Sequence, residues 1–331
     1  MKPLRFGIRI AAIEPPEDFV ESVKLAEELG FDSIWIPDSR LHFDLYVSLA
    51  LAALNTTKVR LGSAVTNPYT RHPGMTAVGI ASVDQLSGGR AALGLGAGGM
   101  VLELLEIERR QPVAACRQAV EQIRHHLGSH SSTKANGYVP LDLPTRADLP
   151  IFIAGTRQKM LALAGEIGDG VIVNVGAHQA CIETAFSTVE KGAGRANRDP
   201  ESLEKLCWLQ ATAVSEEAAE AVNLVKPTAA LMLRHLPPWM IEAMQLEEKN
   251  IREIHRAFQA EGAKAAARVV SDDMIERFTV SGTPERAVEE IKRLGKQGFD
   301  EIIFVAVEIE GNVRPVMTAL AEKVVAKLRT D

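Results

Sequence analysis

The sequence predicts a single (β/α)8 TIM barrel with a helical insertion before the last strand. Short β-branched runs alternate with amphipathic helices, which is typical of a parallel sheet. Eight such strands follow one another in βα order, and no linker divides them into two halves. The length of 331 residues suits such a barrel. We therefore expect one domain over residues 1–331, closed into a barrel, in preference to two doubly wound domains.

The first two strands show the pattern most clearly. Residues 5–11 form the first predicted strand, after which Pro15 and Pro16 open a helix that Gly30 ends. Residues 31–37, FDSIWIP, form the second strand. Its almost wholly apolar character is expected for a strand that is buried on both faces.

The remaining elements follow in order. Further strands are predicted at 59–65, 91–96, 151–154, 170–175, 206–214 and 300–305, and further helices at 44–54, 75–86, 113–127, 158–167, 284–296 and 313–328. Residues 216–275 are also helical in pattern, with predicted breaks at Pro227 and at Pro237–Pro238. We expect the insertion to cover approximately residues 216–278, and the polar segment 129–149 to be a loop.

Composition excludes several classes of function. The net charge of −6, with acids and bases interleaved, argues against a nucleic-acid surface. No apolar run reaches the roughly 20 residues of a membrane span, and the first residues do not resemble a signal peptide. Three widely spaced cysteines argue against a disulfide framework or a metal site. We expect a cytoplasmic protein whose partner is a small molecule.

In barrels of this kind the active site lies on the loops after the strands, which places Arg90, just before a strand, on the opposite face. The segment GSAVTNPYTRHP, residues 62–73, ends a strand in small residues, which allow close approach of a planar ligand. An ordinary strand–turn–helix connection is the alternative. GLGAGG, residues 94–99, lacks the spacing of a dinucleotide fingerprint. It is either a loop that needs positive φ or a rim of cofactor contacts.

A phosphate site is predicted after the fifth strand. Gly155, Thr156 and Arg157 combine free backbone N–H groups at a helix start with a hydroxyl and a guanidinium. Asn174, Val175 and Gly176, one strand further on, would complete it. No strand carries a Schiff-base lysine, and no GxSxG elbow occurs, which favours a cofactor that brings its own reactivity.

At these segments the chain resembles the bacterial luciferase-like superfamily of flavin- and deazaflavin-dependent oxidoreductases. Within it, the likeness is greatest to the coenzyme F420-dependent methylenetetrahydromethanopterin reductases. The resemblance covers nearly the whole chain and rests on segments in matching order: FDSIWIPD, VTNPYTRHP, SGGRAALGLGAG, LPIFIAGTRQKMLALAGEIGDGVIVN and VSGTPERAVEEI. It implies a (β/α)8 barrel, a homodimer, and a cofactor ring against the end of strand three. It also implies a non-proline cis peptide bond at Ala64–Val65.

The resemblance further implies which residues form the site. The residues expected to contact the cofactor are Ala64, Val65, Thr66, Asn67, Gly96, Ala97, Gly98, Gly155, Thr156, Arg157, Asn174, Val175 and Gly176. The candidate catalytic residues are Asp38, Ser39 and Glu308, and the candidate substrate contacts are Arg9 and Arg71. Two positions depart from the relatives. Asp38–Ser39 stands where they commonly have Asp-His, and Arg9 stands where the reductases have glutamate, so we expect a substrate other than the pterin.

Three functions remain open. The first is hydride transfer between coenzyme F420 and an unsaturated or carbonyl compound, with Asp38 as acid and Glu308 as a second acid/base candidate. The second is a monooxygenase that uses reduced FMN and molecular oxygen. The third is a flavin-binding barrel without turnover. The VTNPYTRHP segment favours the deazaflavin branch.

Overall fold

The computed structural model describes residues 3–38, 41–128 and 141–330, and it confirms the predicted (β/α)8 barrel. In the described residues the strands form one sheet in the order β6-β5-β4-β3-β2-β1-β9-β7-β8, and β6 also pairs with β7. The first half of the chain contains β1 (Arg5–Arg9), α1 (Pro16–Glu28), β2 (Ser33–Ile36), α2 (Leu45–Asn55), β3 (Arg60–Ser63), α3 (Pro73–Ser87), β4 (Ala91–Leu95), α4 (Met100–Leu104), α5 (Pro112–Gly128), β5 (Ile151–Gly155) and α6 (Gln158–Ile167).

The second half contains β6 (Gly170–Val173), α7 (Gln179–Arg195), the 3-10 turn η1 (Pro200–Ser202), β7 (Glu204–Val214), α8 (Ala218–Leu233), α9 (Pro238–Ala243), α10 (Glu248–Glu261), α11 (Ala263–Val269), α12 (Asp272–Phe278), β8 (Ser281–Gly282), α13 (Pro284–Lys296), β9 (Glu301–Ala306), α14 (Arg314–Leu320), the π-helical turn η2 (Ala321–Val325) and α15 (Ala326–Thr330). The predicted eighth strand is β9, since β8 has only two residues. The sequence patterns did not predict α4, α7 or β8.

One predicted break is wrong. Pro227 was expected to interrupt the helical segment, but α8 continues through it from Ala218 to Leu233. A proline removes one helical N–H donor and costs about 3 kcal/mol in a helix interior. Here α8 buries an apolar face that includes Val225 and Leu233, and this packing holds the helix together. The break at Pro237–Pro238 is confirmed, because α9 begins at Pro238.

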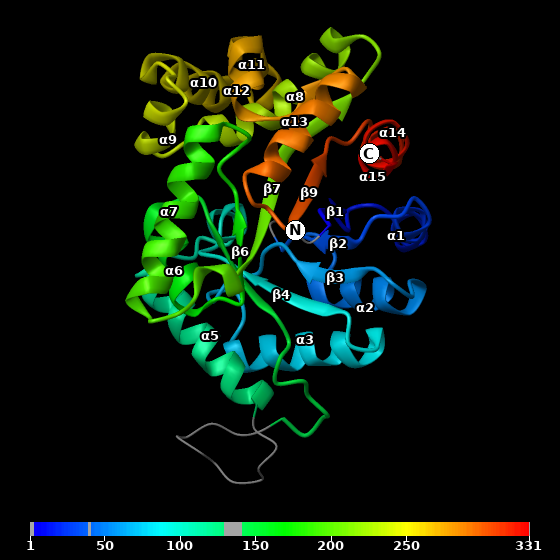
Figure 1. The fold of residues 1–331 in the computed structure, drawn as a ribbon, viewed down its shortest axis with the longest axis vertical. Helices are drawn as coiled ribbons and strands as arrows, with labels where there is room; N and C mark the ends of the chain where they lie inside the picture. Colours follow the sequence, from blue (N-terminus) through cyan, green and yellow to red (C-terminus); the bar gives the residue numbers. More distant parts are fainter. Residues whose placement is uncertain (1–2, 39–40, 129–140, 331) are drawn as a thin grey trace. The chain divides into compact units, whose positions relative to one another are not determined.

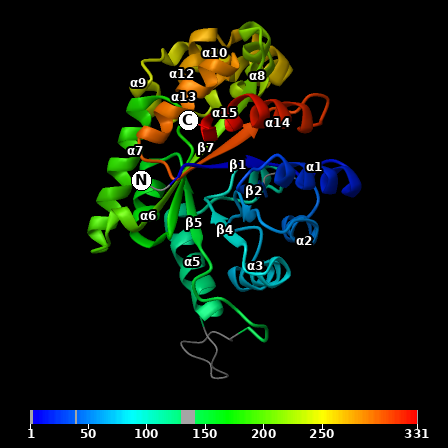
Figure 2. The same ribbon diagram turned by 45° about the vertical axis from the view of Figure 1, so that its right-hand side comes forward.

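The described residues form two compact units. One consists of residues 3–8, 173–187 and 205–330, in which β1 and β7 both pair in parallel with β9. Phe6 on β1 stacks on Phe304 of β9 with ring centroids 6.2 Å apart. The helices α8 to α12, which come between β7 and β9 in the sequence, lie together in Figures 1 and 2, where they are coloured from yellow-green to orange.

The other unit consists of residues 9–172 and 188–204 and contains β2 to β5 in parallel register. Its core is built around Trp35 of β2, which is fully buried and meets Phe152 of β5 edge-on at 5.7 Å. The indole lies over Gly62 of β3, where an added Cβ would come within 2.3 Å of the ring. The helices α2 and α3 lie side by side in Figures 1 and 2.

Arg90 lies just before β4, on the face that the sequence assigns to stability. Its guanidinium donates to the backbone carbonyls of Ala53, Thr56, Val59 and Ser87 and to the Thr56 hydroxyl, at 2.6–3.1 Å. A single side chain thus joins the end of α2, the start of β3 and the end of α3. Carbonyl groups at helix ends need such partners because no further turn supplies a donor.

We predict that Arg90→Leu lowers the free energy of unfolding by about 3 kcal/mol, because the buried carbonyls lose their donor while remaining buried. Urea denaturation followed by circular dichroism measures this change. Arg252→Leu is the control, since Arg252 forms only an exposed ion pair with Glu248 at 3.0 Å and its loss costs less than about 1 kcal/mol. Equal effects of the two substitutions would contradict the proposed role of Arg90.

Candidate active site

The carboxyl ends of β2 to β5 bring together most of the residues that the sequence singled out. Asp38 follows β2, the segment 64–67 follows β3, the segment 96–98 follows β4, and residues 155–157 join β5 to α6. Because neighbouring parallel strands end at the same edge of a sheet, these segments share one face of their unit. This unit therefore contains the greater part of the candidate site.

The end of β3 carries the predicted non-proline cis peptide bond at Ala64–Val65, which the structure confirms. The Ala64 N–H donates to the Ile36 carbonyl at 2.8 Å. Past the cis bond, the Thr66 N–H donates to the Gly94 carbonyl at 3.0 Å, and the Thr66 carbonyl accepts from the Gly96 N–H at 2.9 Å. The chain after β3 is therefore hydrogen-bonded to both neighbouring strands.

Two glycines of β4 and its following loop make room for this segment. A Cβ on Gly94 would lie 2.1 Å from the Ser63 carbonyl oxygen, and one on Gly96 would lie 2.7 Å from a methyl carbon of Val65. The Ser63 hydroxyl also donates to the Gly94 carbonyl and accepts from the Gly94 N–H, both at 2.9 Å. Val65 is half-buried and packs on these glycines. The glycine-rich segment therefore serves close backbone packing at this edge.

Asp38 is the half-buried carboxyl group of this edge. Its Oδ2 accepts a hydrogen bond from the hydroxyl of Thr66 at 2.8 Å, and Thr66 itself is fully buried. Burial raises the pKa of the Asp38 carboxyl, and the charge of Asp44 acts in the same direction. The Thr66 hydroxyl and the charge of Arg71 lower this pKa but do not cancel the effect of burial. A carboxyl with a raised pKa keeps its proton to higher pH than an exposed aspartate does, which suits it to act as an acid.

Arg71, a predicted substrate contact, is already engaged within the protein. Its guanidinium pairs with Asp44 Oδ2 at 3.2 Å and lies 4.7 Å from the centre of the Tyr46 ring. The other oxygen of Asp44 caps α2 by accepting from the N–H groups of Tyr46 and Val47, at 2.9 and 3.2 Å. Sequence reasoning missed Asp44 and Tyr46. An aspartate directly before an apolar helix is an N-cap signature that could have identified Asp44.

Asn67 is also engaged by its own turn. Its Oδ1 accepts from the N–H groups of Tyr69 and Thr70, at 2.9 and 3.0 Å, and its amide donates to the Thr70 hydroxyl at 3.0 Å. With only 1% of its surface exposed, the side chain shapes the turn after β3. The side chain of Asn67 is therefore engaged within its own turn.

The predicted phosphate site lies where β5 joins α6. Gly155 is buried, Thr156 is half-buried and Arg157 is exposed. Arg157 occupies the N-cap position of α6, and its side chain makes no cap hydrogen bond to the helix. An uncapped helix start beside a hydroxyl and a guanidinium is suited to bind an anion.

The remaining predicted residues lie outside this edge or outside the described chain. In the other unit, Asn174 accepts a hydrogen bond from Gln210 at 3.4 Å, Val175 is fully buried, and Gly176 has a positive φ of 74°. A Cβ on Gly176 would lie 2.6 Å from the Phe278 carbonyl oxygen. Glu308 is half-buried in the same unit, and Arg9 is the half-buried last residue of β1. Ser39 lies outside the described residues.

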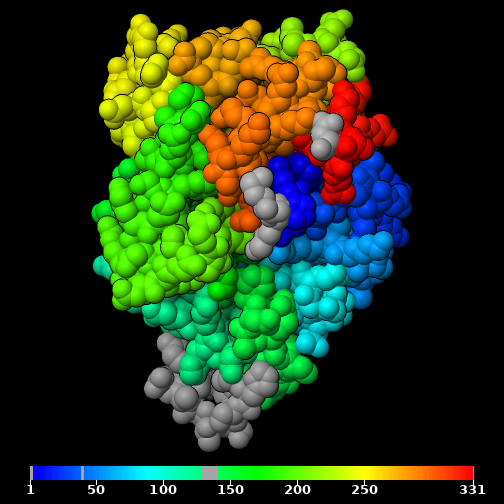
Figure 3. Space-filling model, in the orientation of Figure 1, coloured from blue at the N-terminus to red at the C-terminus, as the bar shows by residue number. Residues whose placement is uncertain are grey.

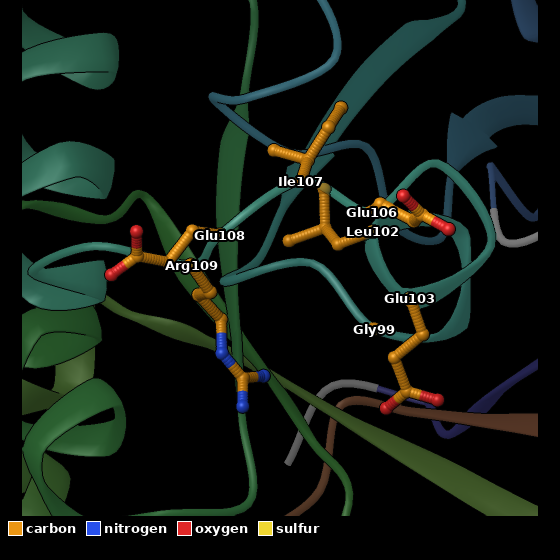
Figure 4. A pocket seen from close by; sticks show the side chains of 7 residues that line it. All are labelled: Gly99, Leu102, Glu103, Glu106, Ile107, Glu108 and Arg109. Carbon is orange, nitrogen blue, oxygen red and sulfur yellow. The ribbon is translucent and has the colours of Figure 1, made fainter.

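A pocket of about 310 Å³ follows the glycine-rich loop (Figure 4). The residues that line it are Gly99, Leu102, Glu103, Glu106, Ile107, Glu108 and Arg109. Of these, only Gly99 belongs to a segment that the sequence singled out. Arg109 donates to the Gly98 carbonyl at 3.2 Å, which ties the pocket wall to the loop after β4. Its lining carries three acidic side chains and one basic side chain.

Three other features bear on the choice of function. Within the described residues, no group of three or more histidine, cysteine or acidic side chains could hold a metal ion. In the same part of the chain, every helix is too short or too polar to cross a membrane. The three cysteines are buried and form no disulfide, and burial raises the pKa of each thiol to about 12.

We predict that Gly94→Ala lowers the free energy of unfolding by about 3 kcal/mol, because its Cβ would collide with the Ser63 backbone. Thermal denaturation measures the loss. Gly194→Ala is the matched control: a Cβ there meets nothing within 4 Å, so the same substitution should be neutral or slightly stabilising. A neutral Gly94→Ala would show that the β3–β4 edge can relax and that the close approach is not required.

Comparison with known proteins agrees with this architecture. The chain is 31% identical over 307 residues to a 5,10-methylenetetrahydromethanopterin reductase of Methanolobus tindarius, covering 91% of this chain and 93% of the relative. It is 32% identical over 310 residues to a reductase of the same name from Archaeoglobus fulgidus, covering 91% and 92%. The solved structure of the coenzyme F420-dependent tetrahydromethanopterin reductase from Methanopyrus kandleri matches with a TM-score of 0.86 and 26% identity, over 98% of this chain and 99% of that one. The luciferase-like monooxygenase family model matches residues 3–301, and the chain therefore belongs to the luciferase-like family.

Proposed function

We propose that this protein is a coenzyme F420-dependent oxidoreductase that transfers a hydride between the deazaflavin and a small organic substrate. The observation that carries the proposal is the end of β3, where the Ala64–Val65 segment packs on Gly94 and Gly96, and Thr66 donates to Asp38. Similarity of 31–32% to the methylenetetrahydromethanopterin reductases, over 91% of the chain, supports a deazaflavin over FMN.

The residues present fit such a cofactor. The uncapped start of α6, with Thr156 and Arg157, would bind its phosphate. The backbone of Gly96, Ala97 and Gly98 would line its side chain, since Gly96 and Gly98 have no side chain to obstruct it. Ala64, Val65 and Thr66 would support the ring, and Asn174, Val175 and Gly176 remain predicted cofactor contacts. When bound, the deazaflavin supplies the hydride chemistry.

Asp38 would handle the proton that accompanies the hydride. When hydride adds to a carbonyl or imine carbon, the π electrons move to the oxygen or nitrogen, which then takes up one proton. Asp38 in its protonated form would donate that proton and become a carboxylate, and the reverse reaction would return it. The raised pKa of Asp38 keeps the acid form populated at higher pH than an exposed aspartate allows. Glu308 and Ser39 remain secondary candidates.

The substrate would enter through the pocket formed by residues 99–109, which begins directly after the cofactor-lining loop. Arg71 is held by Asp44 and Tyr46, and so would shape the site without pairing with the substrate. Arg9 would be the remaining cationic contact. We expect ketones, enones or imines as substrates, because these groups accept a hydride at carbon and a proton at an adjacent heteroatom or carbon.

We also propose that the protein is a homodimer. Among the described residues, ten large apolar side chains are exposed, and six of them lie on α2, on α3 or just before α2: Leu41, Phe43, Val47, Leu54, Met75 and Leu86. The sequence of α2, LYVSLALAALN, contains no charged residue. A helix that is apolar on every side is normally buried. Figure 3 shows the surface of α1 to α3 in blue to cyan.

We further propose a cytoplasmic location and a single catalytic domain over residues 1–331. The three buried cysteines without disulfides support a reducing compartment. One match over residues 3–301 supports a single domain, with approximately residues 216–278 as a helical insertion before the last strand.

We predict that the purified protein binds coenzyme F420 with micromolar or tighter affinity and binds FMN more weakly, as followed by fluorescence quenching of each. Arg157→Gln should weaken F420 binding about tenfold by removing a charge-assisted bond to phosphate. Lys191→Gln, at an exposed position on α7, is the control and should leave the affinity unchanged. Preference for FMN would overturn the hydride-transfer proposal and favour an oxygen-dependent monooxygenase.

We predict that Val47→Glu combined with Leu54→Glu halves the mass in sedimentation equilibrium, because two charges would be buried at the α2 interface. Leu104→Glu serves as the control, since this residue is 53% exposed but lies on α4. A wild-type protein that sediments as a monomer would rule out the homodimer. A double variant that remains dimeric would exclude α2 as its interface.

A further inference from the structure

Tyr46 is held firmly in the first turn of α2. Its N–H donates to Asp44 at 2.9 Å, and the Arg71 guanidinium lies 4.7 Å from the centre of its ring. The ring packs so closely on Gly79 of α3 that an added Cβ there would lie 2.6 Å from a ring carbon. With both backbone and ring fixed, the position of the phenolic oxygen is fixed as well.

The hydroxyl of Tyr46 is buried and has no hydrogen-bond partner among the described residues. A buried hydroxyl without a partner destabilises a folded protein, whereas phenylalanine would fill the same space without that cost. Burial raises the pKa of Tyr46 to about 12, although the hydroxyls of Thr76 and Thr66 and the charge of Arg71 oppose this effect. The phenol is therefore a neutral donor whose proton is unused in this state.

Thr66 links this donor to Asp38. Its hydroxyl gives its only proton to Asp38 Oδ2 at 2.8 Å, and its oxygen keeps lone pairs that can accept. Two hydroxyls lower the pKa of Tyr46, that of Thr76 and, more weakly, that of Thr66, and only Thr66 is bonded to Asp38. We propose that Tyr46 is a positioning residue that donates through Thr66 to stabilise the carboxylate form of Asp38 after it has released its proton.

This chain of donors responds to the charge of Asp38. When the carboxyl is protonated, the bond from Thr66 is between neutral groups, and Tyr46 gains little by joining it. When the carboxyl is ionised, the bond from Thr66 becomes charge-assisted, and the polarised Thr66 oxygen becomes a better acceptor for Tyr46. The tyrosine thereby favours proton release from Asp38 without touching the substrate. This inference rests on the proposed role of Asp38 as proton donor.

The other charged groups near Asp38 cannot take this role. Asp44, at the start of α2, raises the pKa of Asp38, while Arg71, in the segment before α3, lowers it. These two form an ion pair at 3.2 Å, so their effects on Asp38 largely oppose one another. The donor bonded directly to Asp38 is the Thr66 hydroxyl, and the proposal adds the Tyr46 hydroxyl behind it.

The test is a titration of Asp38 in the full-length, cofactor-free protein. Aspartate labelled with 13C at its carboxyl carbon is followed by NMR across pH, and Asp38→Asn identifies the resonance of Asp38. Tyr46→Phe removes only the hydroxyl, so the carboxylate loses a stabilising donor and the pKa of Asp38 rises by about half a pH unit or more. Tyr69→Phe is the matched control, since its hydroxyl donates to the Arg110 carbonyl at 2.8 Å, and it leaves this pKa unchanged.

Two further measurements separate a donor role from a packing role. In a Thr66→Val background, Tyr46→Phe should have no additional effect on Asp38, because the connecting hydroxyl is gone. Tyr46→Phe should also keep or raise the melting temperature, since it removes a buried hydroxyl without a partner. An unchanged pKa of Asp38 in Tyr46→Phe, or an equal shift in the Thr66→Val background, overturns the inference. Failure to bind coenzyme F420 would overturn the proposed function but leave this titration unaffected.

Discussion

The candidate site depends on the hydrogen bonds that continue from β3 to β4 beyond the end of β3. Thr66 donates to the Gly94 carbonyl and accepts from the Gly96 N–H, which fixes its backbone after the Ala64–Val65 step. That register is possible only because residue 94 has no Cβ to meet the Ser63 carbonyl. With the backbone of Thr66 fixed, its hydroxyl reaches Asp38. A packing constraint in the strands thus sets the position of a titratable group in the neighbouring loop.

Most of the charged groups discussed here make structural contacts, whereas Asp38 is a candidate for proton transfer. Asp44 uses one oxygen to cap α2 and the other to hold Arg71, whose guanidinium covers the Tyr46 ring. Arg90, on the opposite face, donates to four backbone carbonyls and to the Thr56 hydroxyl. Asp38 differs because its recorded partner is a hydroxyl and not a cation. A half-buried carboxyl held by a neutral donor can change its protonation state at a lower cost than one in an ion pair.

Much of this arrangement could be predicted from sequence, because strand order and the strand-end rule need only local patterns. Those patterns locate Asp38, the 64–67 segment and the glycine-rich loop at one edge, and they place Arg90 at the other. They could not locate Tyr46, since a tyrosine among apolar helical positions looks like core until its hydroxyl is found without a partner. They also predicted a helix break at Pro227, but the energetic cost of this proline is outweighed by the apolar face that α8 buries. Arg71 and Asn67 stay predicted ligand contacts, but a motif does not reveal that both side chains are also bonded within the protein.

The hydrogen bonds around Asp38 bear on the residue that follows it, where the family resemblance implies a histidine. The family resemblance implies an Asp-His pair here, whereas this sequence has Asp38–Ser39 and so no imidazole at position 39. We propose that the carboxyl of Asp38 transfers the proton instead, and a raised pKa lets a carboxyl hold that proton to higher pH. Burial raises the pKa of Asp38, and the hydroxyl of Thr66 limits the rise. In the proposed network, the Tyr46 hydroxyl stabilises the Asp38 carboxylate through Thr66 once the proton has been released.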